Sequence, residues 1–196
     1  MPRRVLVILG HPDKSPKRFC RALADAYAEG AAAAGHSVQR IDIAMIDVPL
    51  LRTQDEFESG SVPETLIDAQ AAITAAEHLV FVFPLWLGTM PALLKAFLEQ
   101  MMRPGTAFAY PEDKSGSVRM LLKGRSARLV VTMGMPAIVY RLWYFNHGIS
   151  VLRRSVLNFV GIRPVRETLF GMVEAVADAK RKKWIDQMRE LGKRAA

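Results

Sequence analysis

The sequence is poor in the residues and segments on which disulfide, zinc and membrane proteins depend. It has one cysteine, Cys20, in 196 residues, so an internal disulfide and a cysteine-based zinc site are excluded, and Cys20 is interpreted as a small buried hydrophobe. Its four histidines, at positions 11, 36, 78 and 147, have no metal-ligand spacing. The longest nearly unbroken apolar run, residues 79–87, is too short for a transmembrane helix, and the N-terminal apolar stretch is too short for a signal peptide. We therefore expect a cytoplasmic protein without a metal site or stable membrane insertion.

Several motifs of nucleotide-binding and hydrolytic enzymes are also absent. The chain has no G-x-G-x-x-G and no G-x-x-x-x-G-K-[ST], so neither a Rossmann dinucleotide site nor a P-loop is indicated. It has no G-x-S-x-G nucleophile elbow. The formal net charge of +8 is compatible with nucleic-acid binding, but the basic residues are scattered, and the run Lys180 to Lys183 lies between Asp178 and Asp186 on a predicted helix. Without a known nucleic-acid signature we expect no nucleic-acid partner, and such binding stays only an alternative hypothesis.

What the sequence does contain is a regular alternation of short apolar runs and amphipathic stretches. The apolar runs predict strands at residues 4–9, 38–43, 78–84, 128–132 and 163–169. The amphipathic stretches predict helices at residues 16–34, 63–76, 92–102, 149–160 and 173–191. Ser15 is the predicted N-cap of the first helix, with Pro16 at its first position. Residues 44–62 carry turn and charge signals, and residues 103–127 are expected to be irregular apart from a short extended piece at 107–110.

This alternation of strand and helix predicts an α/β fold with a parallel sheet. The length suits one domain, residues 1–196. Five strands with right-handed crossovers fit a flavodoxin-like three-layer sandwich whose five-stranded parallel sheet has the order 2-1-3-4-5. In such a sheet a ligand binds at the carboxyl ends of the strands, at the switch point between strands 1 and 3.

Three loops of different character follow the strands that meet at this switch point. The loop after the first strand is polar and basic beside a predicted helix N-terminus, which favours an anion, and contains His11, Lys14, Ser15, Lys17 and Arg18. The loop after the third strand is apolar and contains Trp86, Leu87 and Gly88. The loop after the fourth strand contains Gly134, Pro136 and Tyr140. A phosphate-binding end beside a flat apolar end is what a mononucleotide with a large planar ring requires.

Each of these residues also has a simpler structural interpretation when taken alone. His11 can be a surface histidine that flanks a helix, and Ser15 can be a plain N-cap. Trp86 can serve core or interface packing, and Tyr140 and His147 can be ordinary surface or interface residues. The functional interpretation gains support because all three loops lie at the same end of one predicted sheet.

Several segments, in order along the chain, carry a resemblance to a known family. They are Gly10-His11-Pro12, the stretch Phe83 to Lys95 (FPLWLGTMPALLK), Phe108-Ala109-Tyr110, Leu121 to Arg125, and Thr132-x-Gly134 followed by Tyr140. Over about residues 4–170 the sequence resembles the flavodoxin-like NAD(P)H:quinone oxidoreductases. Related members include ancillary subunits of potassium efflux systems and modulators of drug activity, all of which are FMN or FAD proteins.

The resemblance implies a role for each matching position. The flavin phosphate would be surrounded by His11, Ser15, Lys17 and Arg18. The isoalloxazine ring would be held by Pro84, Leu85, Trp86, Leu87 and Gly88, and its pyrimidine side would be lined by Thr132, Met133 and Gly134. Tyr140 and His147 would stand near flavin N1/O2 and the acceptor as catalytic residues. The sequence departs from the family pattern at Arg18, where Asn is frequent, and at Met133, where Gly is common.

The resemblance further implies an enzyme that passes a hydride from NAD(P)H through bound FMN, or FAD, to a quinone or similar acceptor. One shared flavin face for both substrates implies ping-pong kinetics. FMN-dependent azo or nitro reduction needs the same site and stays open, as does NADH against NADPH. A flavin-fold regulatory subunit of a membrane transporter and a one-electron carrier are the other classes. The Trp143-Tyr144-Phe145 cluster is interpreted as a homodimer surface or, alternatively, as a contact for a foreign partner.

Overall fold

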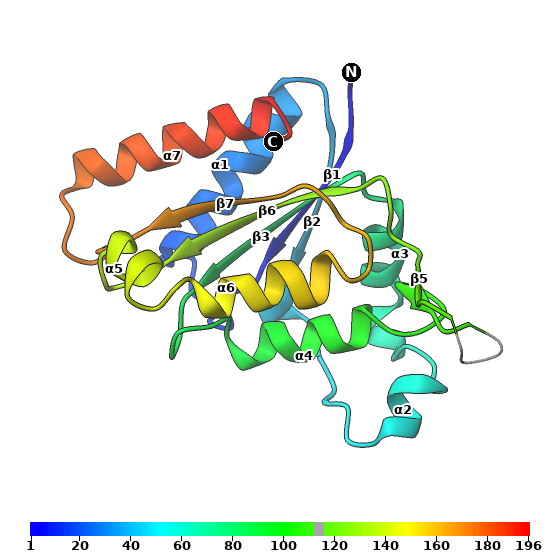
Figure 1. Cartoon of the computed structure of the whole chain (residues 1–196). Coiled ribbons are helices and arrows are strands. Elements are labelled where there is room, and N and C mark those ends of the chain that lie inside the picture. The colour runs from blue at the N-terminus through cyan, green and yellow to red at the C-terminus, as the bar shows by residue number, and fades with distance from the viewer. Residues whose placement is uncertain (112–115) are drawn as a thin grey trace.

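The computed structural model describes residues 1–111 and 116–196 and contains a five-stranded sheet (Figure 1). The strand order is β2-β1-β3-β6-β7, and every neighbouring pair is parallel. The strands are β1 (Arg4–Leu9), β2 (Ser37–Asp42), β3 (His78–Pro84), β6 (Ser126–Thr132) and β7 (Val165–Phe170). Counted along this sheet alone, the order is 2-1-3-4-5, so the predicted flavodoxin-like topology is confirmed.

Helices cover both faces of the sheet, which makes the three layers visible in Figure 1. Over one face, α1 (Phe19–Ala33) packs against α7 (Asp178–Lys193). Over the other face lie α3 (Ile67–Ala75), α4 (Ala92–Met101) and α6 (His147–Val151), which continues into a π-helical stretch, Leu152–Leu157. The shorter helical elements are the 3-10 turns Ile43–Met45 and Glu64–Leu66, α2 (Gln54–Glu58) and α5 (Ala137–Leu142).

The central strands are buried on both faces, which explains why their sequences are continuous apolar runs. In β1 the residues Val5 to Leu9 are all at most 2% exposed. Leu6 and Ile8 pack into the core on the α3 and α4 side, whereas Val5 and Val7 pack into a second core beneath α1 and α7. The sheet therefore separates two apolar cores.

Helix α1 begins at Phe19 rather than at Pro16, so the predicted N-cap role of Ser15 is wrong. The Ser15 N–H donates to Oδ1 of Asp13 at 2.7 Å, and the Arg18 N–H donates to the Ser15 carbonyl oxygen at 3.4 Å. These bonds close turns where the first helical turn was expected, because a nearby carboxylate competes with the helix for backbone donors. The loop after β1 consequently extends to Arg18.

Other boundaries differ where short elements left no periodic signal. The short extended piece predicted at 107–110 is confirmed as β4 (Phe108–Ala109), which pairs antiparallel with β5 (Arg119–Met120) in the region otherwise expected to be irregular. The part of that prediction covering 112–115 lies outside the described residues. The turn-rich region 44–62 contains α2, and the closing helix begins at Asp178 instead of 173. The helix predicted at 149–160 starts two residues earlier, after a left-handed Asn146. Within the described ranges, no helix combines the length and apolar character needed to span a membrane.

Candidate functional site

A cavity of about 780 Å³ opens at the carboxyl ends of β1, β3 and β6. This is the switch point of the strand order, where flavodoxin-like sheets bind their ligands. Nine of the twelve predicted cofactor-binding residues line the cavity: His11, Lys17, Arg18, Pro84, Leu85, Trp86, Thr132, Met133 and Gly134. Ser15, Leu87 and Gly88 belong to the same loops without lining it. The volume lies within the usual range of small-molecule sites, about 300–1,000 Å³.

The basic loop and the apolar loop meet directly in this cavity. The His11 and Trp86 rings lie 5.9 Å apart between centroids, at an interplanar angle of 79°. This edge-to-face arrangement is a preferred geometry of ring pairs. Residues 75 positions apart in the sequence thus place a polar, cationic end and an aromatic end on one cavity.

His11 is nearly buried and is held by the backbone of its own loop. Its Nδ1 atom accepts the Asp13 N–H at 3.0 Å. Burial, reinforced by the nearby Arg18 guanidinium, lowers the pKa of His11. A neutral imidazole that accepts at Nδ1 carries its proton on Nε2, so His11 brings a donor to the cavity. Arg18 itself is oriented by Asp13, since its Nε donates to Oδ2 at 2.7 Å.

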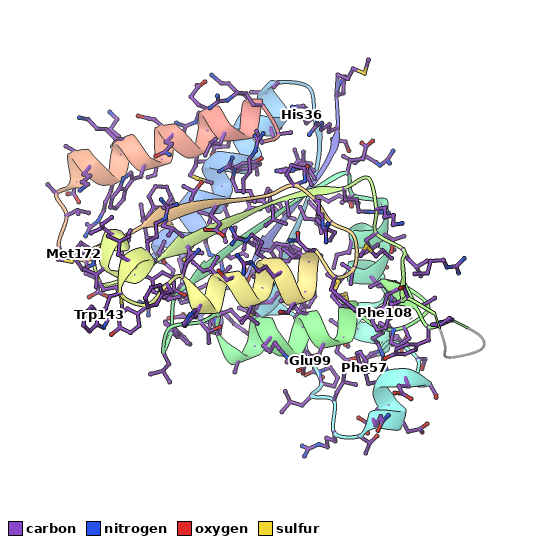
Figure 2. The ribbon with its side chains drawn as sticks, viewed as in Figure 1. His36, Phe57, Glu99, Phe108, Trp143 and Met172 are labelled. Carbon is purple, nitrogen blue, oxygen red and sulfur yellow. The ribbon has the colours of Figure 1, made fainter. Side chains whose placement is uncertain are left out.

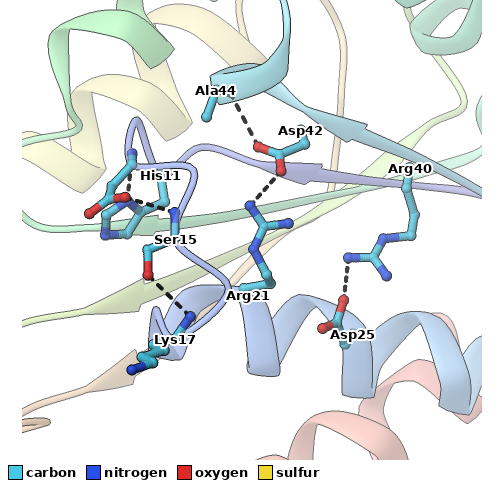
Figure 3. A network of polar contacts seen from close by, with 9 residues as sticks. His11, Ser15, Lys17, Arg21, Asp25, Arg40, Asp42 and Ala44 are labelled. Carbon is cyan, nitrogen blue, oxygen red and sulfur yellow. Dashed lines mark hydrogen bonds and ion pairs between the residues drawn. The ribbon is translucent and has the colours of Figure 1, made fainter.

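Polar contacts hold the loop after β1 and the strand beside it in a defined shape (Figure 3). The Lys17 backbone N–H donates to Oγ of Ser15 at 3.4 Å, and the Lys17 side chain is exposed. One turn into α1, Arg21 pairs with Asp42 at the end of β2, at 2.6 Å. These contacts fix the backbone conformation of the loop that carries the cationic side chains.

The apolar loop after β3 is a tight turn whose tip carries two left-handed residues. The N–H groups of Trp86 and Thr89 donate to each other's carbonyl oxygens at 2.9 and 3.0 Å. Leu87 has φ 48° and Gly88 has φ 80°. A positive φ is uncommon for leucine, and such strained residues cluster at functional sites. The turn projects Leu87 fully into solvent and keeps Trp86 half-exposed at the cavity wall.

The loop after β6 supplies the third side of the cavity. The Met133 N–H donates to the Phe170 carbonyl oxygen at 2.9 Å, so this backbone donor is already bonded to the end of β7 and does not face a ligand. The Gly134 N–H has no hydrogen-bond partner within residues 1–111 and 116–196, and a Cβ at Gly134 would meet nothing within 4 Å. Gly134 therefore offers an accessible backbone donor beside an uncrowded wall.

Cys20 lies at the bottom of the cavity and is chemically quiet. Its Sγ lies 3.2 Å from Oγ1 of Thr132, and the residue is 2% exposed. Burial raises the pKa of the thiol to about 12, so the thiol stays protonated. The interpretation of Cys20 as a small buried hydrophobe is confirmed.

Tyr140 and His147 do not line the cavity. The Tyr140 hydroxyl donates to the Gly88 carbonyl oxygen at 2.8 Å and accepts the Ile149 N–H at 3.3 Å, and burial raises the pKa of Tyr140. A Cβ at Gly148 would lie 2.1 Å from the same Gly88 oxygen, so this segment packs closely against the apolar turn. His147 is exposed, with its ring 5.8 Å from that of Phe145.

Arg181, at the start of α7, also lines the cavity and was missed because it belongs to the basic run interpreted as a solvated helix face. Its Nε and Nη2 atoms donate to the Val173 carbonyl oxygen at 3.2 and 3.0 Å, and its Nη1 donates to Asp178 at 3.0 Å. The sequence signal that could have indicated its role was its position near the start of the helix that follows the last strand, beside the carboxyl ends of the strands. Arg181 adds a cation to those of Lys17 and Arg18.

Comparison with known proteins agrees with this architecture. A family model described as "Flavodoxin-like fold" (Flavodoxin_2) matches residues 3–191. An "Uncharacterized NAD(P)H oxidoreductase" of Haemophilus influenzae is 28% identical over 92% of this chain and 90% of its own length. The "FMN-dependent NADH:quinone oxidoreductase" of Beijerinckia indica is 31% identical over 68% of this chain and 67% of its own.

Solved structures of similar shape carry the same fold. The NAD(P)H:quinone oxidoreductase from Methanothermobacter marburgensis has a TM-score of 0.82 at 24% identity and covers 100% of both chains. An FMN-dependent NADH-azoreductase from Bacillus anthracis, solved in complex with FMN, has a TM-score of 0.77 at 18% identity and covers 99% of both chains. The matched family model, which spans nearly the whole sequence, places this chain in the Flavodoxin_2 family of flavodoxin-like proteins.

Proposed function

We propose that this flavodoxin-like chain binds FMN in the carboxyl-end cavity and is an NAD(P)H oxidoreductase that reduces a quinone or similar acceptor. The observation that carries the proposal is the contact of His11 with Trp86, which joins a phosphate-binding loop to an aromatic ring platform in one cavity. The relatives named as FMN-dependent NADH:quinone oxidoreductases support the same cofactor and substrates.

The residues present fit FMN in size, charge and shape. The cavity of about 780 Å³ suits a mononucleotide. Its basic loop carries Lys17 and Arg18, and the Nε2–H of His11 adds a neutral donor for a phosphate oxygen. At the other end, Gly134 provides a backbone N–H that has no partner among the described residues and no side chain to obstruct a flat ring. A backbone N–H donor in this position suits the carbonyl-bearing edge of the isoalloxazine ring.

Each loop then has a separate task in holding the cofactor. Ser15 shapes the phosphate loop through its hydroxyl and N–H, although it does not line the cavity. Leu87 and Gly88 form the tip of the turn that fixes Trp86, and Tyr140 secures this tip from behind. The remaining ring contacts come from Pro84, Leu85, Thr132 and Met133. Bound FMN would supply the redox chemistry between NAD(P)H and the acceptor, while the protein supplies orientation and electrostatics.

We propose that both substrates approach the exposed side of this cavity in turn, which predicts ping-pong kinetics. Tyr140 is nearly buried behind the turn, so its contribution is to hold the ring platform. His147 is exposed and directly precedes Gly148, which packs against the apolar turn, and it is the proposed proton source or sink beside the acceptor. The cytoplasm, where NAD(P)H serves as a soluble reductant, is the compartment that this activity predicts.

A homodimer is proposed across the apolar face formed by α5 and the loop that follows it. The large exposed side chains of this face are Ile138, Leu142, Trp143, Tyr144 and Phe145, with Trp143 77% exposed. Figure 2 places Trp143 and Met172 at the same end of the molecule. Exposed aromatic groups of this extent are typical of interfaces. Sedimentation of wild type and Trp143→Ala tests it: a dimer that Trp143→Ala weakens supports the proposal, whereas a monomeric wild type contradicts it.

The proposed activity is tested by purifying the protein and supplying FMN. We expect a yellow protein whose flavin absorbance is lost on addition of NADH or NADPH and returns when a quinone is added. An azo dye in place of the quinone tests the second candidate activity, which the likeness to the azoreductase fold makes worth measuring. A protein that stays colourless in the presence of FMN would defeat both activities.

A further inference from the structure

A second cavity lies at the opposite edge of the sheet, where strands β3, β6 and β7 begin. Its volume is about 540 Å³, and its walls include His78, Ser126 and Pro164. Figure 1 places both marked chain ends at this edge, and His36, labelled in Figure 2, accepts the Arg3 N–H here at 3.0 Å. The cofactor cavity opens at the other ends of β3 and β6 and shares no lining residue with this one, so the two cavities are separate.

The walls of this amino-edge cavity carry a strong excess of positive charge. Five arginines line it: Arg3, Arg125, Arg163, Arg166 and Arg194. The one acidic side chain among the described lining residues is Glu77, whose Oε2 already accepts the Arg4 N–H at 2.9 Å. Five guanidinium groups therefore face one carboxylate that is engaged elsewhere.

These arginines hold only neutral partners in the described part of the chain. Arg3 donates to the Ala195 carbonyl oxygen at 3.3 Å, and Arg163 donates to that of Asn158 at a long 3.4 Å. None of the five has a carboxylate within 4 Å in residues 1–111 and 116–196. The Nε atom of Arg125 is buried there without a hydrogen-bond partner. Arg125 donates to the Lys123 and Thr74 carbonyl oxygens, and Arg194 donates to that of Glu190. The exposed guanidinium groups of Arg3, Arg163 and Arg166 retain further donors for an incoming anion.

The floor of the cavity is polar, buried and pre-formed. His78 is 1% exposed, with Nε2 2.9 Å from the Tyr27 hydroxyl and Nδ1 2.7 Å from Oγ of Ser126. Arg128 is buried without lining the cavity and donates to Oγ1 of Thr168 at 2.6 Å. Burial, reinforced by Arg128, Arg3 and Arg166, lowers the pKa of His78 to about 3, so this buried imidazole is neutral.

We propose that the amino-edge cavity binds a small phosphate-bearing anion of up to mononucleotide size, at a site distinct from the cofactor cavity. Concentrated like charge is unfavourable, and a multivalent anion relieves it. Arginine presents a planar fork that pairs with two phosphate oxygens at once, so several arginines around a bounded cavity select phosphate over a single carboxylate. The bounded volume selects a small molecule over a nucleic-acid strand.

The probe for this site is inorganic pyrophosphate, titrated by calorimetry into the FMN-loaded protein, in which the phosphate end of the cofactor cavity is filled. The test variant is the double substitution Arg163→Gln with Arg166→Gln, since both side chains are exposed and make few contacts. The matched control is Lys182→Gln with Lys183→Gln, which removes the same charge from the exposed surface of α7. We expect the test variant to weaken pyrophosphate binding about tenfold or more and the control to change it less than twofold.

A third variant, Arg163→Lys with Arg166→Lys, separates fork geometry from charge alone. The proposal expects it to restore binding only in part, because lysine keeps the charge without the fork. The proposal is overturned if the Gln variant binds pyrophosphate as tightly as wild type, if both Gln variants weaken it equally, or if the Lys variant restores it fully. It is also overturned if a single-stranded DNA oligonucleotide, and not pyrophosphate, depends on Arg163 and Arg166. If the protein takes up no FMN, the proposed activity fails, and the same titration in Lys17→Gln with Arg18→Gln still tests this site.

Discussion

The two cavities differ both in how much positive charge they carry and in how they hold it. The carboxyl-edge cavity is lined by Lys17, Arg18 and Arg181 beside Asp13 and Glu174, whereas the amino-edge cavity is lined by five arginines beside Glu77. In the carboxyl-edge cavity both lining arginines have carboxylate partners, since Arg18 pairs with Asp13 and Arg181 with Asp178. At the amino edge the five cavity arginines have none among the described residues. Paired arginines are held in fixed orientations, whereas unpaired ones keep their donors for a ligand.

The side chains that surround the cationic groups also differ between the two cavities. The carboxyl-edge cavity places cations beside an aromatic wall, through the contact of His11 with Trp86. The amino-edge cavity has no aromatic side chain among its described lining residues other than the His78 ring. A flavin needs both surfaces at once, and a simple phosphate needs only the charge. The comparison therefore assigns different ligands to the two cavities.

The comparison predicts that substitutions at the two edges affect FMN binding differently, and this is the largest expected effect. Lys17→Gln with Arg18→Gln should weaken FMN binding about 100-fold, because two charge-assisted contacts to phosphate are lost. Arg163→Gln with Arg166→Gln should leave FMN binding within twofold of wild type. Fluorescence titration of FMN into the apoproteins measures both. Equal losses in the two variants would mean that the charge acts as one diffuse field.

The apolar turn should be sensitive to packing in a way that the open wall of the cavity is not. In Gly148→Ala the new Cβ would lie 2.1 Å from the Gly88 carbonyl oxygen, so the turn or α6 must move. We expect a loss of about 2–3 kcal/mol in the free energy of unfolding. Gly134→Ala is the control, since its Cβ meets nothing within 4 Å. Chemical denaturation measures both, and a Gly148→Ala protein as stable as Gly134→Ala would refute the close contact.

The histidine beneath the amino-edge cavity should make stability depend on pH. The pKa of His78 is about 3 in the folded protein, below its ordinary value of 6.5. The unfolded chain therefore binds a proton that the folded protein does not, and stability falls as pH drops from 6.5 toward 3. Between pH 6.5 and pH 5 this amounts to about 2 kcal/mol.

This pH dependence is checked by denaturation at pH 7 and pH 5. His78→Gln should lower stability at both values but should lose less of it on acidification than wild type does. His36→Gln, which removes another histidine near the same edge, is the control and should retain the wild-type dependence. An unchanged pH dependence in His78→Gln would show that another group is responsible.

The sequence was sufficient to predict the sheet and the cavity that holds the candidate site, for a clear physical reason. Strands buried on both faces, such as β1 and β3, must be continuous apolar runs, and parallel crossovers then leave few possible strand orders. The strand order alone therefore predicts that the loops after β1 and β3 lie next to each other. The meeting of His11 and Trp86 follows from that topology.

What the sequence could not predict depends on side chains that reach across the fold. Asp13 accepts the Ser15 N–H and delays the start of α1, although Ser15 and Pro16 have the spacing of a helix start. Arg181 turns back to the Val173 carbonyl oxygen and so reaches the cofactor cavity from a basic run. The amino-edge cavity gathers residues from positions 3 to 196, which form no motif in the linear sequence.

The smallest expected effect concerns a carboxylate that secures the segment around His147. Glu167, whose side chain is 8% exposed, lies 2.8 Å from Arg153 and accepts from Nδ2 of Asn146 at 2.8 Å. Because Asn146 directly precedes His147, Glu167→Gln should destabilise the fold by about 1 kcal/mol and loosen this segment. Glu99→Gln, which removes an exposed pair with Lys95, should cost less than about 0.5 kcal/mol.

Turnover of the FMN-loaded enzyme distinguishes a local effect of Glu167 from a general one. If Glu167 positions His147, Glu167→Gln should alter the pH profile of kcat, whereas Glu99→Gln should leave that profile unchanged. A loss of stability with an unaltered pH profile would restrict Glu167 to a structural role. His147 would then need another group to orient it.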